Sequence, residues 1–143
     1  MERRKFLLNA GIFSAFAGVT QNSFATLNIE DKSNLQPFLL PATAPLEHND
    51  GMAVKVWVRS AMTGGIYSNI ECAVAPKKMG PPPHFHIALD ELMYVAEGTA
   101  SILIGDDVVE VQAGGWHLRP RGIQHTFWNA SDKPLRFYDM YFN

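Results

Sequence analysis

Residues 80–98 read GPPPHFHIALDELMYVAEG and place two histidines, His84 and His86, one residue apart, with a carboxylate at Glu91. In an extended strand successive side chains point to opposite faces, so both imidazoles would share one face and Phe85 would take the other. A second strand that starts at Glu91 could run back beside the first and bring its carboxylate to the same face. This spacing predicts a metal site.

A fourth ligand must come from elsewhere, and residues 114–129 offer His125. Together the two stretches resemble the cupin family, specifically a small single-domain cupin. Its first motif has a glycine, His-x-His, three or four residues, Glu, six residues and a glycine. Its second motif has a glycine, five residues, Pro-x-Gly, two residues, His, three residues and Asn. Beside the four candidate ligands, the matching positions are Gly98, Gly114, Pro120, Gly122 and Asn129.

The resemblance has one departure, at the start of the first motif. The expected glycine position is Lys78, and the nearest glycine is Gly80, which three prolines follow. We interpret this as a different loop into the His-x-His strand. The six-residue gap before Gly98 favours Glu91 over its neighbour Asp90 as the acidic ligand. The resemblance implies one divalent transition metal, with Fe, Mn, Ni, Zn and Cu not distinguished, held by His84, His86, Glu91 and His125.

Composition narrows the classes of protein and site. The 143 residues suit one domain, and 47% hydrophobic with 18% charged residues favours a globular fold over disorder. The net charge is −2, or about −4 without the charged first residues, so nucleic acid is not an expected partner. Cys72 is the single cysteine, which excludes an intrachain disulfide and a cysteine-based zinc site. We expect Cys72 to be a small apolar strand residue.

The first 25 residues resemble a secretory signal. Arg3, Arg4 and Lys5 precede a weakly apolar run, and the small-x-small pattern that ends at Ala25 favours cleavage after that residue. The paired arginines resemble the twin-arginine export signal, which predicts a periplasmic or otherwise exported protein. A retained anchor is the alternative, but the apolar run is shorter than the roughly 20 residues that a span needs. We expect no stable membrane span after cleavage.

Residues 26–50 contain prolines at positions 37, 41 and 45, which block a continuous helix and favour extended chain. This segment is either a free tether or a strap across the domain or a partner subunit. The apolar Phe38–Leu40 favours the strap. Phe137, Tyr141 and Phe142 add apolar surface, and together with the habit of cupins this predicts a homodimer.

From residue 51 onward the pattern predicts one all-β domain, residues 51–143. Alternating or apolar runs separated by glycine and proline indicate about eight short strands, without repeats or an amphipathic helix. Gly105-Asp106-Asp107 is typical of a hairpin turn. Such a chain forms an antiparallel sandwich or barrel, and the cupin resemblance implies the jelly roll, or double-stranded β-helix. The expected strands are residues 54–58, 66–74, 91–97, 99–104, 108–112, 115–119, 123–129 and 135–142.

Strand alternation also nominates residues that line a pocket above the ion. Met93 shares the face of Glu91, and Phe127 and Asn129 share that of His125, although plain filling of the barrel is the alternative for each. His117 and Arg119 share a face on their own strand. They are candidates for an acid or base and for a carboxylate fork toward an anionic substrate. A solvated edge, or a salt bridge to an acid such as Glu110 or Asp139, is the alternative.

Three functions fit these residues. The first is a metal-dependent enzyme acting on a small organic molecule, with Glu91 as the candidate catalytic residue. The resemblance implies a quercetinase-like dioxygenase first, with decarboxylase, isomerase and lyase activities as alternatives. The second is a non-catalytic module that binds or senses a small ligand. The third is a metal-free structural barrel, which the complete ligand set disfavours. His48 lies in a turn-rich stretch and is expected to face solvent.

Overall fold

The structure, a computed structural model, describes residues 35–143, which all belong to one compact unit, Ser33–Asn143. The predicted signal segment, residues 1–25, and residues 26–34 of the expected strap lie outside this described part of the chain. Among residues 35–143, no helix has the length and apolar character needed to cross a membrane.

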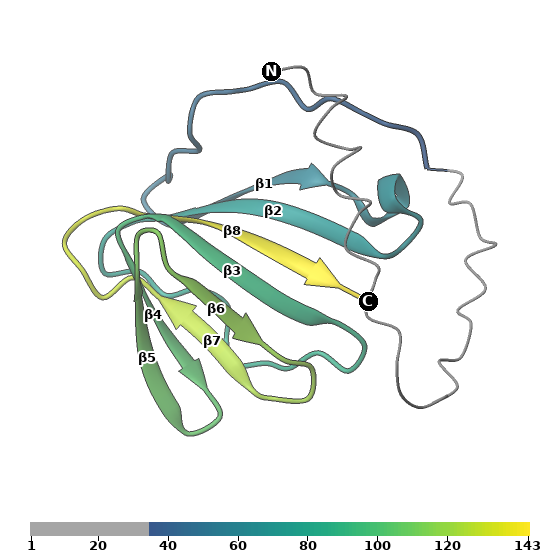
Figure 1. The fold of residues 1–143 in the computed structure, drawn as a ribbon. Helices are drawn as coiled ribbons and strands as arrows, with labels where there is room; N and C mark the ends of the chain where they lie inside the picture. The colour runs from purple at the N-terminus through teal and green to yellow at the C-terminus, as the bar shows by residue number, and fades with distance from the viewer. Residues whose placement is uncertain (1–34) are drawn as a thin grey trace, which may run out of the picture. The chain divides into compact units, whose positions relative to one another are not determined.

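The described chain forms two antiparallel β-sheets (Figure 1). One has five strands in the order β1-β2-β8-β3-β6, and the other has three in the order β5-β4-β7. This confirms the predicted all-β fold and agrees with a jelly-roll barrel. The elements are β1 (Met52–Val58), the short 3-10 helix η1 (Ser60–Thr63), β2 (Tyr67–Val74), β3 (Asp90–Glu97), β4 (Thr99–Ile104), β5 (Asp107–Gln112), β6 (Trp116–Arg119), β7 (His125–Trp128) and β8 (Leu135–Phe142).

The core lies between the two sheets, where strand alternation sends one side-chain set inward. On β3, Met93 and Val95 are fully buried, and each contributes about 1.5–3 kcal/mol through burial. Cys72 is buried in the same core, as expected. The expectation that Phe137 lies on the surface is wrong. Phe137 is fully buried because β8 is central in the wider sheet, and its ring lies 4.9 Å from that of Phe127, centroid to centroid.

β1 is one of the two edge strands of the wider sheet, and two of its valines are only partly covered. Val54 and Val56 lie opposite Cys72 and Ile70 in the register of β1 and β2. They nevertheless remain 50% and 46% exposed. An edge strand has a neighbour on one side only, so apolar side chains on it are left for another surface to cover.

The predicted pairing of the His84 and His86 segment with the strand at Glu91 is wrong. His84 instead forms an isolated bridge with His125, in which each backbone N–H donates to the other residue's carbonyl, at 3.0 and 2.8 Å. The strand that contains Glu91 pairs with β6 and β8. The prolines at 81–83 lack backbone N–H groups, so this segment cannot extend a regular ladder.

Two glycines shape the loops around the His-x-His segment and β3. Gly98 follows β3 with φ of 79°, and a Cβ there would clash with the carbonyl oxygen of Pro134. Gly80 donates its N–H to the carbonyl of Phe127 at 2.9 Å, and an added Cβ would lie 2.6 Å from the Phe127 ring. Gly80 lies where this sequence differs from the first cupin motif, and the close approach of Phe127 requires a residue without a side chain there.

Side-chain hydrogen bonds join residues 43–48 to the outer face of β1 and β2. The buried carboxylate of Glu71 joins this segment to the sheet. It accepts hydrogen bonds from the backbone N–H of Leu46 at 3.1 Å and from the indole of Trp57 at 2.9 Å, and it pairs with Arg136 at 3.3 Å. By contrast, Leu39 in the preceding part of the segment is 88% exposed.

The hydrogen bonds to Glu71 predict a pH-dependent stability. Burial raises the pKa of Glu71, but the bonds from Leu46, Trp57 and Arg136 outweigh it and lower this pKa overall. A glutamate in the unfolded chain has a pKa of about 4.3. The contribution of ionised Glu71 to the free energy of unfolding is therefore complete above that pH, and it is lost as the pH falls through the lower pKa of the folded state.

We expect Glu71→Gln to lower the free energy of unfolding by about 1–3 kcal/mol at pH 7, because the charged acceptor is lost. The difference from the unmodified protein should shrink as the pH falls below about 4. Urea unfolding at a series of pH values measures both effects, with Glu110→Gln at an exposed position as the control. A deficit of equal size at pH 7 and pH 3 would contradict this account.

Candidate metal centre

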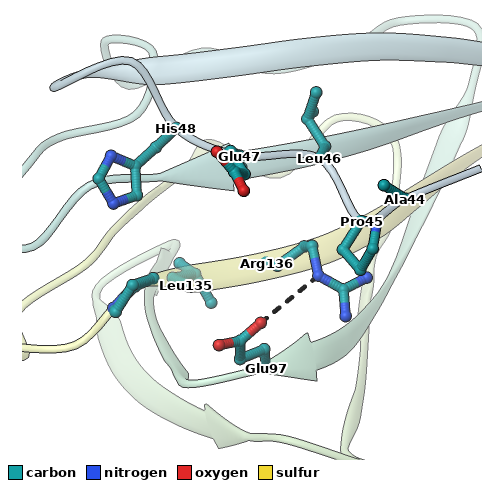
Figure 2. A pocket seen from close by; sticks show the side chains of 10 residues that line it. Ala44, Pro45, Leu46, Glu47, His48, Glu97, Leu135 and Arg136 are labelled. Atoms are coloured by element: carbon teal, nitrogen blue, oxygen red, sulfur yellow. Dashed lines mark ion pairs between the residues drawn. The ribbon is translucent and has the colours of Figure 1, made fainter.

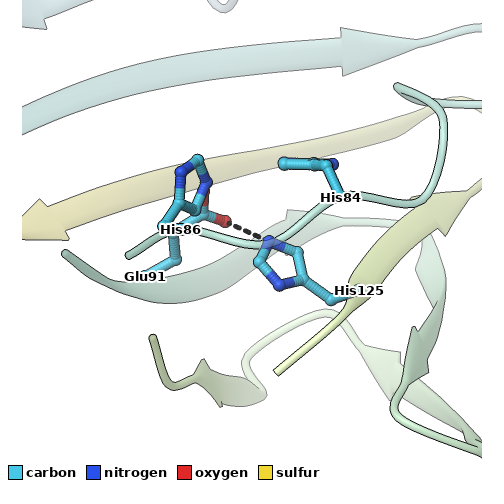
Figure 3. Close-up of side chains that lie close together, drawn as sticks. All are labelled: His84, His86, Glu91 and His125. Carbon is cyan, nitrogen blue, oxygen red and sulfur yellow. Dashed lines mark hydrogen bonds and ion pairs between the residues drawn. The ribbon is translucent and has the colours of Figure 1, made fainter. Parts of the chain in front are cut away.

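The structure brings together the four predicted ligands, His84, His86, Glu91 and His125 (Figure 3). Glu91 lies near the start of β3 in the wider sheet, and His125 begins β7 in the narrower one. The two remaining histidines come from the loop that precedes β3. Each residue offers one donor atom, and these four atoms all lie within 4.8 Å of one another. The site thus joins the two sheets.

Backbone carbonyls orient two of the imidazoles. The Nδ1 atom of His84 lies 2.9 Å from the carbonyl oxygen of Pro82, and Nδ1 of His125 lies 3.0 Å from that of Ile123. A carbonyl oxygen accepts only, so each Nδ1 carries a proton, and in the neutral imidazole each Nε2 then keeps a lone pair. This arrangement is typical of metal-binding histidines, whose second nitrogen usually donates to a carbonyl or carboxylate.

The polar atoms of the cluster fit a cation. Nε2 of His125 is buried without a hydrogen-bond partner, so its lone pair is available to an ion. It lies 3.4 Å from Oε2 of Glu91, while Nε2 of His86 lies 2.5 Å from Oε1. When ionised, the buried Glu91, Arg119 and Asp139 carry one net negative charge between them. A divalent ion with nitrogen and oxygen ligands would satisfy both the lone pair and this charge.

Glu91 is well suited to remain a carboxylate. Burial raises its pKa, but the neighbouring His125 and the positive charge of Arg119 outweigh burial and lower it below its ordinary value overall. An ionised carboxylate with three neutral imidazoles suits first-row divalent metals. When bound, such an ion supplies Lewis acidity, an acidified water or a place for dioxygen.

Arg119 is not available as the predicted fork for an anionic substrate. Its side chain is 1% exposed and contacts Glu91, at 3.1 Å, and Asp139. The salt bridge to Asp139 is the alternative that the structure shows. His117 is half-buried beside it, and its Nδ1 has no hydrogen-bond partner. Burial, together with the charges of Arg119 and His125, lowers the pKa of His117, and its role as an acid or base stays a prediction.

The three predicted lining residues fill the barrel. Met93 is fully buried and Phe127 is 5% exposed, both within the hydrophobic core. The side-chain amide of Asn129 donates to the backbone carbonyls of Val74, Ala75 and Lys133, at 2.7–3.2 Å. Asn129 thus ties backbone segments together. Contact of Met93 or Phe127 with a substrate stays a prediction.

Sequence reasoning missed Tyr141 as part of the site, and it named Asp139 only as a possible salt-bridge partner for the strand that contains Arg119. Tyr141 lies opposite Glu91 in the register of β3 and β8, and its ring packs edge-on against His86 with centroids 6.4 Å apart. Burial, with the nearby charges of Asp139 and Glu91, raises the pKa of Tyr141, so the phenol stays neutral and can donate a hydrogen bond. The signal was present in the alternation of β8, which sends residues 135, 137, 139 and 141 to one face.

A cavity of about 420 Å³ lies elsewhere, beside the strap (Figure 2). Residues 44–48 form one wall, and Glu97 and Arg136, an ion pair at 3.5 Å, form part of another. Glu97 ends β3, whereas Glu91 lies near its start, so about 20 Å of strand separates this cavity from the four ligands. His48 lines the cavity and is half-buried, contrary to the expectation that it faces solvent.

We expect the described chain to bind one divalent ion through the four ligands, and His125→Ala to abolish stoichiometric binding. Loss of a group that only supports a ligand usually costs about 10–100-fold in affinity, and loss of the ligand itself should cost more. Equilibrium dialysis against Mn²⁺, Co²⁺, Ni²⁺ and Zn²⁺ measures this, with circular dichroism to verify folding. His48→Ala removes a histidine outside the cluster and should bind as the unmodified protein does. Equal binding by both variants would refute the site.

Comparison with known proteins agrees with this geometry. The Cupin domain family model matches residues 70–141. No curated protein matches the sequence.

Solved structures show the same fold. A predicted oxalate decarboxylase from Thermotoga maritima is 15% identical with a TM-score of 0.61, over 64% of this chain and 79% of that one. The TT1209 protein from Thermus thermophilus is 20% identical with a TM-score of 0.59, over 66% and 86%. An oxalate oxidase in complex with the substrate analogue glycolate is 22% identical with a TM-score of 0.56, over 67% and 53%. Since the family match covers half of the sequence, the chain belongs to the cupin domain family.

Proposed function

We propose that this cupin is a metal-dependent enzyme that acts on a small organic molecule, with dioxygenase chemistry as the first reaction to test. The observation that carries the proposal is the difference in exposure across the ligand cluster. The side chains of Glu91 and His125 are 4% and 1% exposed, whereas that of His86 is 28% exposed. Solvent reaches the cluster from the side of the His-x-His loop, and we infer that a small molecule would approach from the same side. A purely structural ion would be enclosed by its ligands.

The chain's own residues provide orientation and proton handling at this site. Tyr141, beside His86, offers a neutral phenol that can donate to an oxygen atom of a bound molecule. Glu91 has one carboxylate oxygen near His86 and the other near Arg119, so it is held rather than free to rotate. Glu91 is therefore better suited as a ligand than as a mobile base, and His117 is the remaining candidate for proton transfer.

The packing favours a small substrate. Met93 and Phe127 are buried in the core, so side chains fill the barrel interior below the cluster. The structural neighbours include an oxalate oxidase and a predicted oxalate decarboxylase. Oxidation or decarboxylation of a small acid is therefore the alternative reaction within the same class, and isomerase or lyase chemistry follows.

A non-catalytic module that binds or senses a small ligand is the second candidate function. The cavity of about 420 Å³ beside the strap supports it, because this cavity can hold a molecule without contact with the candidate ligands. Binding at such a place needs no chemistry at an ion. The two functions differ in whether turnover depends on His125.

Oxygen uptake by the metal-loaded protein with flavonols, small diketones and small carboxylic acids tests the enzyme. We expect turnover with at least one class, with a loss of at least about 100-fold in His125→Ala, because an open metal position is required. His48→Ala should retain the rate. Tight binding of these compounds without turnover by the loaded protein would favour the binding module instead.

We also propose that the protein is exported. The arginine pair at 3 and 4, the apolar run and the small residues that end at Ala25 support this, and a twin-arginine signal would send it to the periplasm.

We propose further that the mature chain is a homodimer. Apolar side chains on two parts of the described chain support this: Val54 and Val56 on the edge strand are about half exposed, and Phe38 and Leu39 of the strap are 50% and 88% exposed. Apolar surface of this kind often marks an interface.

Native mass spectrometry of protein isolated from its own host checks both statements at once. We expect a subunit that begins at Thr26 and a particle of two subunits. A subunit with the first 25 residues retained would contradict cleavage. A single-subunit particle at high concentration would contradict the dimer, and Val54→Lys should dissociate a genuine dimer that uses the edge strand.

A further inference from the structure

Arg119 is the largest fully buried side chain in the described residues, with 1% exposure. It belongs to β6, the edge strand next to β3, and lies directly opposite Glu91 in their register. Its Nη2 atom lies 3.1 Å from Oε2 of Glu91 and also contacts Oδ1 of Asp139 on β8. Three neighbouring strands thus each contribute one charge to a buried row.

A buried guanidinium needs neighbouring groups of opposite charge. Removing an ionised group from water costs several kcal/mol, and the cost is offset only by well-placed opposite charges and hydrogen bonds. Asp139 is 2% exposed. When ionised, its negative charge balances the positive charge of Arg119, so these two groups form a neutral pair. The contact with Glu91 is additional to that pair, and it acts on an oxygen of a candidate metal ligand.

We propose that the Arg119–Asp139 pair is a positioning device for Glu91: the guanidinium engages Oε2 and so fixes the orientation of the carboxylate toward the ion. This inference rests on the proposed metal binding and deepens it. Asp139 fixes the guanidinium from β8, and the guanidinium fixes Glu91 on β3. With Oε2 in contact with Arg119, Oε1 lies 2.5 Å from Nε2 of His86 and Oε2 lies 3.4 Å from Nε2 of His125. Rotation of the carboxylate would therefore break the contact with Arg119 and change both of these distances. Asp139 and Arg119 act through Glu91 and are positioning residues.

The chain contains a matched control pair. Asp90 and Arg121 also form an arginine–aspartate ion pair, at 2.8 Å, and Asp90 is the sequence neighbour of Glu91. This second pair is partly exposed and has no contact with Glu91 among the described ion pairs. The double variant Arg119→Gln/Asp139→Asn and the double variant Asp90→Asn/Arg121→Gln each remove one positive and one negative charge. A difference in metal binding between the two double variants therefore reflects where the charges lie and not a change in net charge.

Binding of Co²⁺ to the full chain, followed by calorimetry and by visible absorption, tests the proposal. We expect Arg119→Gln/Asp139→Asn to bind Co²⁺ about 10–100-fold more weakly, as is usual when a ligand loses its supporting partner. Its absorption spectrum should also change, because a Glu91 carboxylate that is free to rotate alters the coordination geometry. The control double variant should match the unmodified protein in affinity and spectrum.

A variant that fails to fold is recognised by circular dichroism, and Asp139→Asn alone, which keeps the guanidinium and changes few atoms, then carries the test. It should also shift the spectrum. A spectrum and affinity equal to those of the control would overturn the positioning role while leaving metal binding intact. If the unmodified protein binds no Co²⁺, Mn²⁺, Ni²⁺ or Zn²⁺, the proposed function and the positioning role are both overturned.

Discussion

The backbone pairing of His84 with His125 is the contact on which the candidate metal centre depends. Two hydrogen bonds, of 3.0 and 2.8 Å, hold the proline-containing loop against the first residue of β7. The prolines cannot donate to a ladder, so the loop is held by these two bonds together with the bonds from Gly80 to Phe127 and from Gly122 to His86. They bring three imidazoles from two distant parts of the chain opposite Glu91, which belongs to the other sheet. The site thus exists only when both sheets are packed together.

Buried charged side chains lie beside the candidate metal centre and determine its electrostatics. In the low-dielectric interior charges interact more strongly than in water, and an unpaired one is costly. Arg119 stands between two carboxylates, Glu91 and Asp139, so the row carries more negative than positive charge when all three are ionised. A cation is the natural counterpart of such a row. The same physics that stabilises the strands therefore favours a metal beside them.

Away from the candidate metal centre, the wider sheet holds the strap, residues 43–48. There Glu71 joins residues 43–48 to the outer face of the sheet, and Arg136 links it to Glu97 beside the cavity (Figure 2). These contacts make the strap part of the described domain up to Thr43. The apolar side chains that precede it, and those on edge strand β1, remain available to another surface. The candidate metal centre and the cavity beside the strap thus lie near different ends of β3.

The sequence by itself determined the all-β class, the strand ranges to within a few residues and the four residues that converge as candidate ligands. The alternation of apolar and polar side chains along a strand, and the spacing of residues around His84 and His125, can be read directly from the sequence because both depend on local backbone geometry. The sequence did not determine that the His-x-His loop pairs with β7, that Phe137 is buried or that Arg119 faces two carboxylates. Those outcomes follow from which strands become neighbours and which become edges. Only the tertiary structure decides this, because contacts between distant strands are set by the packing of the whole core.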